Sequence, residues 1–278
     1  MQSIAIVTDS TSDLPARLAA ENHISIMPLT VTHKGIIYKD GIDLTPESFY
    51  PMLTNSQELP KTSQPTPHDF KELYRKLLDS SREVLSFHIS GGLSATVETA
   101  RSAAAELDKD RIHVVDSGFL SYALGFQALE AARLAKDGMP PARILNLLSK
   151  LREKTELFFT LDTMHYLYKG GRIGKVSSLM GSILNIKPVI RVENGVYIPA
   201  GKSRSLKHAL TSMVENLSQK YQRSKVIAAI GHGQGHESAM MLMDLARASL
   251  NLAQAPALYE VGPVIGVHTG PGCVGIAV

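Results

Sequence analysis

The sequence is poor in the features that mark secreted and membrane-spanning proteins. Its single cysteine, Cys273, cannot form a disulfide within the chain and is expected to pack as a small apolar side chain. The longest apolar stretch with a helical pattern, residues 119–136, is interrupted by charged residues such as Glu130 and Arg133, so no transmembrane segment is expected. Residues 1–7 lack the basic region of a secretion signal. We therefore expect a cytoplasmic protein.

A strong excess of charge of one sign is also absent. The chain has 29 Lys and Arg residues against 26 Asp and Glu residues, and no run of five like charges. This balance argues against nucleic-acid binding. His232 and His236 have no third partner at metal-ligand spacing, and Asp9 fits a helix cap better than a metal ligand. We expect no bound metal, no cofactor and no nucleic acid.

The pattern that is present alternates strands with helices. Strands are predicted at 3–8, 23–32, 84–89 and 111–115, and helices follow them, one of them at 67–79 with Thr66 as its N-cap. This alternation is typical of a mostly parallel sheet with helices on both faces. After residue 155 the order of elements becomes irregular. We therefore predict an α/β fold with an N-terminal domain at 1–155 and a C-terminal α+β domain with a mixed sheet at 156–278.

Polar turns follow three of the predicted strands, where open α/β sheets bind their ligands. These turns are 9–11, 90–96 and 116–117, and none carries a dinucleotide or P-loop motif. In the second turn, Gly91 and Gly92 allow the backbone to approach a ligand closely, and the helix after them can bind an anion. Ser94 is predicted to lie in the first turn of that helix, where it either contacts such an anion or caps the helix.

Three further segments carry candidate binding residues. The loop 62–65 is stiffened by prolines on both sides, which suits a binding segment or an ordinary surface loop. Arg172 precedes a helix predicted at 176–186 and can pair with an anion or with a nearby carboxylate. The apolar stripe of that helix is typical of a core, with a lipid-lining role as the second interpretation. His268, in the bend 268–272, can donate a hydrogen bond, act as a base or simply pack.

Taken together, these segments resemble the DegV family of bacterial fatty-acid-binding proteins. The resemblance is carried by the motifs TSQP at 62–65, GGLS at 91–94, GGRIGK with LNIKP within 170–188, and HTGPG at 268–272. It extends over essentially the whole chain. It implies a long-chain fatty acid held between two domains and no catalytic activity of the chain itself. It also implies a separate fatty acid kinase subunit as a partner, which converts the bound acid to an acyl phosphate.

The resemblance also assigns roles to single residues. It implies that Thr62 and Ser94 hold the carboxylate, that His268 lies near this head group, and that Arg172 serves the transfer to the kinase. The expected ligand-binding set is completed by neighbours in the same motifs, Ser63, Gly92 and Thr269. Hydroxyl groups can satisfy a desolvated carboxylate, so a strongly basic pocket is not needed.

Two other classes of protein remain as alternatives. Residues 92–96 are close to the G-x-S-x-G turn of serine acyl hydrolases, and Ser94, Asp116 and His268 occur in the expected order. Thr96, however, replaces the second glycine. The third class is a small-molecule kinase subunit related to the dihydroxyacetone kinases, whose fold resembles that of the DegV family. It would need a ketone-binding histidine and a nucleotide partner.

Overall fold

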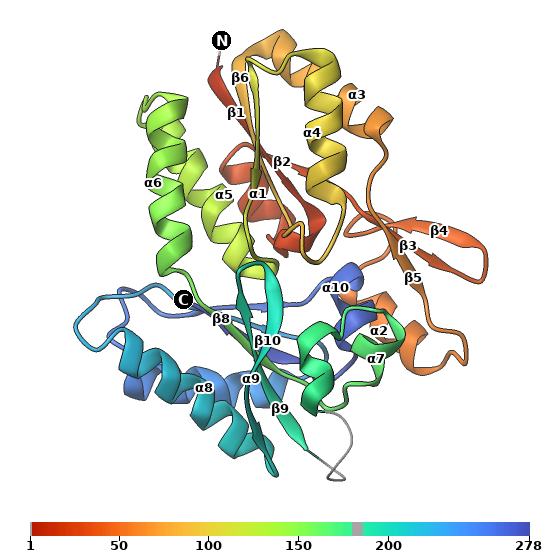
Figure 1. Ribbon diagram of the computed structural model, residues 1–278, viewed down its shortest axis with the longest axis vertical. Helices are drawn as coiled ribbons and strands as arrows, with labels where there is room; N and C mark the ends of the chain where they lie inside the picture. The colour runs from red at the N-terminus through yellow and green to blue at the C-terminus, as the bar shows by residue number, and fades with distance from the viewer. Residues whose placement is uncertain (1, 180–185) are drawn as a thin grey trace.

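A computed structural model describes residues 2–179 and 186–278, and its two larger sheets lie one above the other (Figure 1). The upper sheet contains, in spatial order, β2 (Ile24–Met27), β1 (Gln2–Asp9), β6 (Ser81–His88) and β7 (Ile112–Asp116). All of its neighbouring strands pair in parallel. Residues 4–7 are buried without interruption, as expected for a parallel strand that is covered on both faces.

Helices cover both faces of this parallel sheet. One face carries α3 (Pro67–Ser80) and α4 (Thr96–Leu107), and the other carries α1 (Ala16–Glu21), α5 (Ser121–Lys136) and α6 (Pro141–Lys154). Val7 packs in one cluster with Phe70, whereas its neighbour Ile6 packs in another with Leu124. The helix α3 begins with the predicted Thr66 cap, which forms a capping box with Asp69. The prediction of a parallel sheet between two helical layers is confirmed.

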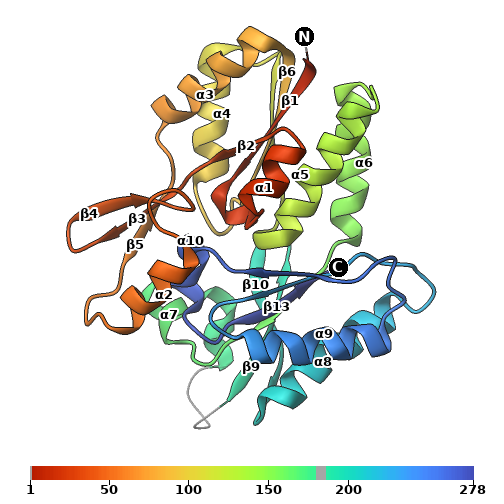
Figure 2. The same ribbon diagram turned by 180° about the vertical axis from the view of Figure 1, so that it is seen from behind.

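The lower sheet is mixed, also as predicted. Its order is β10 (Val196–Ser203), β9 (Lys187–Glu193), β8 (Leu157–Thr160), β13 (Val274–Ala277), β11 (Ala229–His232) and β12 (Ala257–Glu260). Only β11 and β12 pair in parallel. The helices α8 (Leu206–Lys220) and α9 (His236–Ser249) cover one face (Figure 2). The other face, with Phe159 and Tyr197, joins the core that contains Leu124. A division into domains at residue 155 stays a prediction.

A small third sheet carries part of the candidate site. It contains β4 (Ile36–Lys39), β3 (Thr30–His33) and β5 (Lys61–Ser63), with α2 (Pro46–Thr54) in the connection. The single strand predicted at 23–32 is wrong, because β2 ends at Met27 and β3 begins at Thr30 in a different sheet. Pro28, which has no N–H to donate, lies at the break between them.

The remaining elements are short and lie around the site. They are the 3-10 helices η1 (Ser10–Ser12) and η2 (Gly174–Leu179) and the helices α7 (His165–Lys169) and α10 (Pro263–Thr269). The helix predicted at 176–186 is therefore wrong over 176–179, which form part of a 3-10 helix, and at residue 186, which is not helical. Residues 180–185 lie outside the described residues. Within the described part of the chain, no helix combines the length and the apolar character needed to cross a membrane.

Candidate functional site

The structure brings five of the predicted site residues to one small cavity, which we call the inner cavity. Its volume is about 40 Å³. Its predicted residues, from four separate parts of the chain, are Thr62, Ser63, Ser94, Arg172 and His268. The rest of the lining is mostly apolar and consists of Leu29, Gln64, Ile89, Leu93, Leu120, Tyr197, Val264 and Ile265.

A hydrogen bond between Thr62 and His268 closes one side of the inner cavity. Thr62 Oγ1 lies 2.9 Å from His268 Nε2 and joins β5 to α10. Burial, with a further contribution from the positive charge of Arg172, lowers the pKa of His268 to about 4. The imidazole is therefore neutral at pH 7, and its Nδ1 is buried without a partner among the described residues. A neutral imidazole can offer hydrogen bonds but no charge.

Ser94 lines the inner cavity from the turn before α4. The helix starts at Thr96 with Ala95 as its N-cap, so the prediction that Ser94 lies in the first helical turn is wrong. The backbone N–H groups of Leu93 and Ser94 both donate to the carbonyl of Ser90, which forms a tight turn before the helix. Ser94 Oγ lies 2.8 Å from Thr96 Oγ1 and accepts a hydrogen bond from the Thr96 N–H. The hydroxyl thus supports the helix start and also lines the cavity.

Gly92 faces a hairpin rather than the inner cavity. A Cβ atom at this position would lie 2.6 Å from the Gly195 carbonyl oxygen and 2.8 Å from Val196 Cγ1. Ser90 Oγ donates to the same carbonyl at 2.8 Å. The loop between β9 and β10 therefore reaches the upper sheet at this turn (Figure 1). The close approach that a glycine permits here is to the protein's own backbone.

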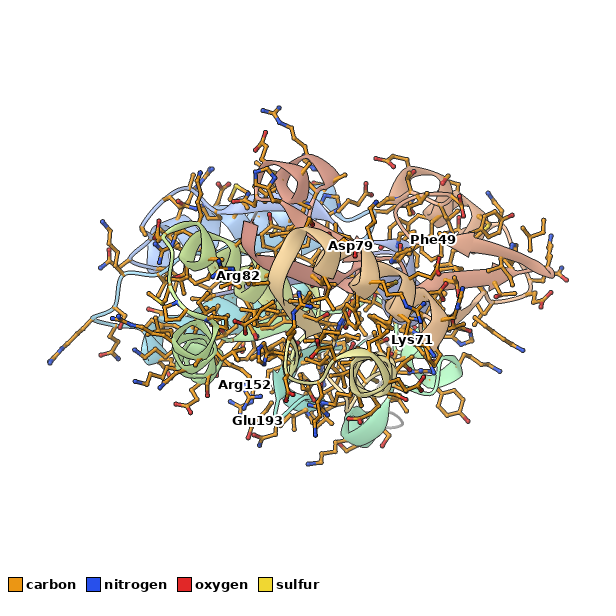
Figure 3. The ribbon with its side chains drawn as sticks, turned by 90° about the horizontal axis from the view of Figure 1, so that it is seen from above. Phe49, Lys71, Asp79, Arg82, Arg152 and Glu193 are labelled. Carbon is orange, nitrogen blue, oxygen red and sulfur yellow. The ribbon has the colours of Figure 1, made fainter. Side chains whose placement is uncertain are left out.

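A polar cleft of about 480 Å³ lies beside the same turn. It is lined by Gly92 and by side chains of both signs, which include Arg152, Arg191, Asp116 and Glu193. Figure 3 shows Arg152 and Glu193 near one another at one edge of the molecule. The mixture of charges gives this cleft no clear preference for an anion or a cation.

Arg172 is fixed by backbone carbonyl groups. Its guanidinium donates to the Gly170 oxygen at 2.8 Å and to the Leu93 oxygen at 3.4 Å. It therefore connects the loop after α7 with the turn that carries Ser94. The side chain is half-buried and holds a positive charge at the edge of the inner cavity.

A second, apolar cavity of about 30 Å³ adjoins the inner cavity. Leu120, Tyr197 and Ile265 line both cavities and therefore separate them. Thr269 lines the apolar cavity, with its hydroxyl donated to the Ile265 carbonyl, and it does not line the inner one. Both volumes are far below the roughly 300–1,000 Å³ of typical ligand pockets. A long ligand can occupy this path only if side chains between the two cavities move.

Cys273 also lines the apolar cavity. Burial raises the pKa of its thiol to about 12, so the thiol stays protonated at neutral pH. A protonated, buried thiol is a poor nucleophile. The prediction that Cys273 packs as a small side chain is confirmed.

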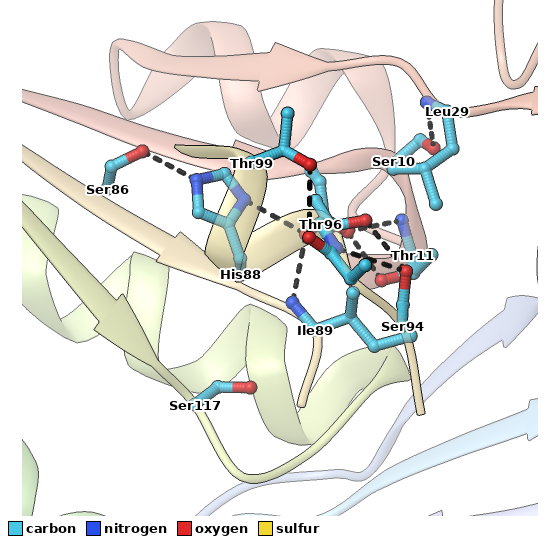
Figure 4. A network of polar contacts seen from close by, with 12 residues as sticks. Ser10, Thr11, Leu29, Ser86, His88, Ile89, Ser94, Thr96, Thr99 and Ser117 are labelled. Atoms are coloured by element: carbon cyan, nitrogen blue, oxygen red, sulfur yellow. Dashed lines mark hydrogen bonds and ion pairs between the residues drawn. The ribbon is translucent and has the colours of Figure 1, made fainter. Parts of the chain in front are cut away.

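A buried polar network, which the sequence did not reveal, fixes the strand end beside the site (Figure 4). Asp9 accepts a hydrogen bond from the Thr11 N–H, as predicted for a cap. Its other oxygen accepts from the Ile89 N–H at 2.9 Å and lies 3.0 Å from His88 Nδ1. The second ring nitrogen of His88 lies 2.7 Å from Ser86 Oγ. Ile89 lines the inner cavity, so this network positions one of its walls.

The three candidate members of a hydrolase triad have other partners. His268 Nε2 bonds to Thr62, and the Ser94 hydroxyl bonds to Thr96. The Asp116 carboxylate accepts two backbone N–H groups from the neighbouring turns. Within the described residues, no three His, Cys, Asp or Glu side chains are placed to hold a metal ion.

Comparison with known proteins identifies relatives over the full length of the chain. The family model described as "Uncharacterised protein, DegV family" matches residues 3–278. A DegV domain-containing protein of Deinococcus radiodurans is 38% identical over 99% of this chain and 98% of its own. The structure of a fatty-acid-binding DegV family protein from Thermus thermophilus superposes with a TM-score of 0.95 at 34% identity, over 99% and 98% of the two chains. The structure of DegV from Bacillus subtilis, described as a fatty acid binding protein, superposes with a TM-score of 0.90 at 32% identity. This match covers 100% of this chain and 99% of the other.

Proposed function

The chain belongs to the DegV family, and on that premise we propose that it binds one long-chain fatty acid. In this proposal the carboxylate lies in the inner cavity and the acyl chain follows the apolar cavity. Both predicted domains contribute to the lining of the two cavities: Leu120 comes before residue 155 in the sequence, and Tyr197 comes after it. The observation that carries the proposal is this succession of a hydroxyl-lined cavity and an apolar one along a single path.

The inner cavity offers the hydrogen bonds that a desolvated carboxylate needs. Thr62 and Ser94 each supply a hydroxyl, and the neutral His268 can supply an N–H. Arg172 adds a positive charge at the edge. Hydrogen bonds to a charged group contribute about 1.5–3 kcal/mol each, and a buried carboxylate without them is strongly disfavoured.

The acyl chain supplies most of the favourable free energy. Burial of a methylene contributes about 0.8 kcal/mol, so about fifteen of them contribute on the order of 12 kcal/mol before costs. Loss of translational freedom and the displacement of Leu120, Tyr197 and Ile265 offset a large part of this. We expect tight but reversible binding, as a carrier requires.

We further propose that the chain is a carrier without catalytic activity of its own, and that a separate kinase phosphorylates the bound acid. Arg172 is the residue that we assign to this transfer, because it borders the inner cavity and also the solvent-facing groove outside it.

The rival assignment, a serine acyl hydrolase, needs Ser94 activated by His268. The observed bond from His268 to Thr62 disfavours it.

Calorimetric titration of delipidated protein with saturated acids of increasing length tests the proposal. A carrier gives an affinity that rises steeply from octanoate to palmitate. An affinity that does not depend on chain length would refute the assignment of the apolar cavity. A fluorophosphonate probe tests the rival, because stoichiometric labelling of Ser94 would identify a hydrolase.

A further inference from the structure

The short helix α10 carries residues of both cavities but has no cap of its own. Ile265 lines the two cavities, and His268 lines the inner one. The N-cap residue of α10, Gly262, has no side chain that could accept a hydrogen bond, and Pro263 at the first helical position has no N–H to donate. The first N–H groups of this segment therefore need acceptors from other parts of the chain.

Two carboxyl groups from the N-terminal part of the chain accept these N–H groups. Asp13 accepts from the Gly262 N–H at 3.0 Å through one oxygen and from the Ser121 hydroxyl at 2.7 Å through the other. Asp40, which is 3% exposed, accepts from the Val264 N–H. A Cβ atom on Gly262 would lie 3.0 Å from Asp13 Oδ1 and 3.5 Å from Asp40 Oδ1, so both carboxyl groups meet at this residue.

The contacts of Asp13 extend to the wall of the apolar cavity. Ser121 Oγ, which donates to Asp13, lies 2.9 Å from the Tyr259 hydroxyl, and both side chains line that cavity. The helix α10 itself packs against α2, α7, β3, β5 and η1 (Figure 2). Asp13 thus connects the end of η1, the start of α5 and the segment between β12 and α10, which come from both predicted domains.

No cation neutralises Asp13 or Asp40. None of the ion pairs in the described part of the chain includes either residue. The titratable groups that face them are Asp9 at the end of β1, Tyr50 on α2, Tyr122 on α5, Tyr259 on β12 and Cys273 before β13. Burial, with the charges of nearby aspartates as a further cause, raises the pKa of Asp13 to about 8 and the pKa of Asp40 to about 7. The packing around α10 therefore favours protons on these two groups near neutral pH.

We propose that Asp13 and Asp40 are positioning residues of the fatty acid site: they hold the start of α10 and thereby place Ile265 and His268 in the cavity walls. This inference rests on the proposed fatty acid binding. Neither carboxyl group lines either cavity, so both act through α10. Because the packed arrangement favours the protonated groups, their deprotonation weakens the hold on α10. The affinity for a fatty acid should therefore fall as the pH rises through the range in which the two groups titrate.

Asparagine is the neutral isostere of a protonated aspartic acid. We expect the wild type to lose about fivefold or more of its affinity for palmitate between pH 6.5 and pH 8.5, relative to Asp13→Asn with Asp40→Asn. The titration of palmitate itself cancels in this comparison, and His268 is neutral throughout the range. The control, Asp79→Asn with Asp110→Asn, removes two exposed carboxylates and should follow the wild-type profile. If the ratio of the wild-type and Asp13→Asn, Asp40→Asn affinities is the same at both pH values, the proposal is wrong.

The placement of α10 can also be measured without lipid. Asp13→Ala with Asp40→Ala removes the acceptors, so an NMR titration should find the pKa of His268 raised from about 4 toward its ordinary value of about 6.5. The asparagine variant, which keeps an acceptor for each N–H group, should keep the low pKa. Equal pKa values of His268 in the alanine variant and the wild type would overturn the proposal.

Two further outcomes have separate meanings. The dispersion of the amide signals shows whether the alanine variant is folded; if it is not, the pH profile of the asparagine variant decides alone. A wild type that binds no palmitate at either pH, while His268 responds to the alanine substitutions as expected, contradicts the proposed function and leaves the two carboxyl groups as the residues that place α10.

Discussion

Thr62 and His268 are separated by 206 positions in the sequence, yet Thr62 Oγ1 and His268 Nε2 lie 2.9 Å apart. The pair joins an edge strand of the small sheet to the short helix before the last strand. It also forms the wall between the inner cavity and a solvent-facing groove of about 650 Å³. The position of the proposed head-group site therefore depends on contacts between the first and the last quarter of the chain.

Removal of both hydroxyls should weaken fatty acid binding without unfolding the protein. We expect Thr62→Ala with Ser94→Ala to lower the affinity for palmitate by tenfold or more, because each hydroxyl supplies a hydrogen bond to a charged oxygen. Thr99→Ala is the matched control. Its hydroxyl donates to a carbonyl of its own helix, and it does not line the cavity. Equal affinity of the double variant and the control would remove Thr62 and Ser94 from the head-group site.

The low pKa of His268 should make the protein less stable in acid. Its folded pKa is about 4, whereas the unfolded chain titrates near the ordinary value of about 6.5, so the unfolded state binds more protons between these values. The free energy of unfolding should therefore fall by up to roughly 3 kcal/mol from pH 7 to pH 4 through this group. His268→Gln, which cannot titrate, should show a smaller fall in urea unfolding. Parallel pH profiles of the two proteins would contradict the buried, neutral state.

Asp13 should make the protein less stable as the pH rises, because its pKa in the folded state is raised. Burial raises it to about 8; its oxygens lie 3.0 Å from the Gly262 N and 2.7 Å from Ser121 Oγ. The folded state thus holds a proton that the unfolded chain has already lost above pH 4, so stability declines as the pH rises to 8. Asp13→Asn should match wild type at pH 4 and exceed it by at least about 1 kcal/mol at pH 8. A variant that is equally destabilised at both pH values would refute this.

The single cysteine provides an internal probe of the acyl chain. Cys273 lines the apolar cavity, so bound palmitate should slow its reaction with a thiol reagent in the native protein at least tenfold. In denaturant, one thiol per chain should react rapidly whether or not palmitate is present. If palmitate binds but leaves the native rate unchanged, the acyl chain follows another path.

Local patterns in the sequence predicted much of the architecture, because they depend on neighbouring residues. The Thr66 cap and the strand predicted at 3–8, which lies within β1, are examples. Contacts between distant segments could not be predicted from such local patterns. The burial of His88 against Asp9 depends on the pairing of β1 with β6, and no single-sequence pattern marks it. The role of Tyr197 in separating the two cavities depends in the same way on how the two sheets meet.

The motifs indicated which residues gather at the inner cavity, but not what each one contacts. Gly92 faces the Gly195 carbonyl, and Thr269 lines the apolar cavity instead of the inner one. Lys61 and Lys169 stand next to recognised motifs, and both line the solvent-facing groove beside the inner cavity. Their convergence required the packing of β5 and α7 around α10.

Native mass spectrometry of delipidated protein mixed with palmitate tests the central claim most directly. The account predicts one palmitate per chain in the wild type and a much smaller bound fraction in the Thr62→Ala, Ser94→Ala variant under the same conditions. A wild-type spectrum without bound palmitate, or a variant that retains it as fully as the wild type, would contradict a fatty acid site built on these two hydroxyls.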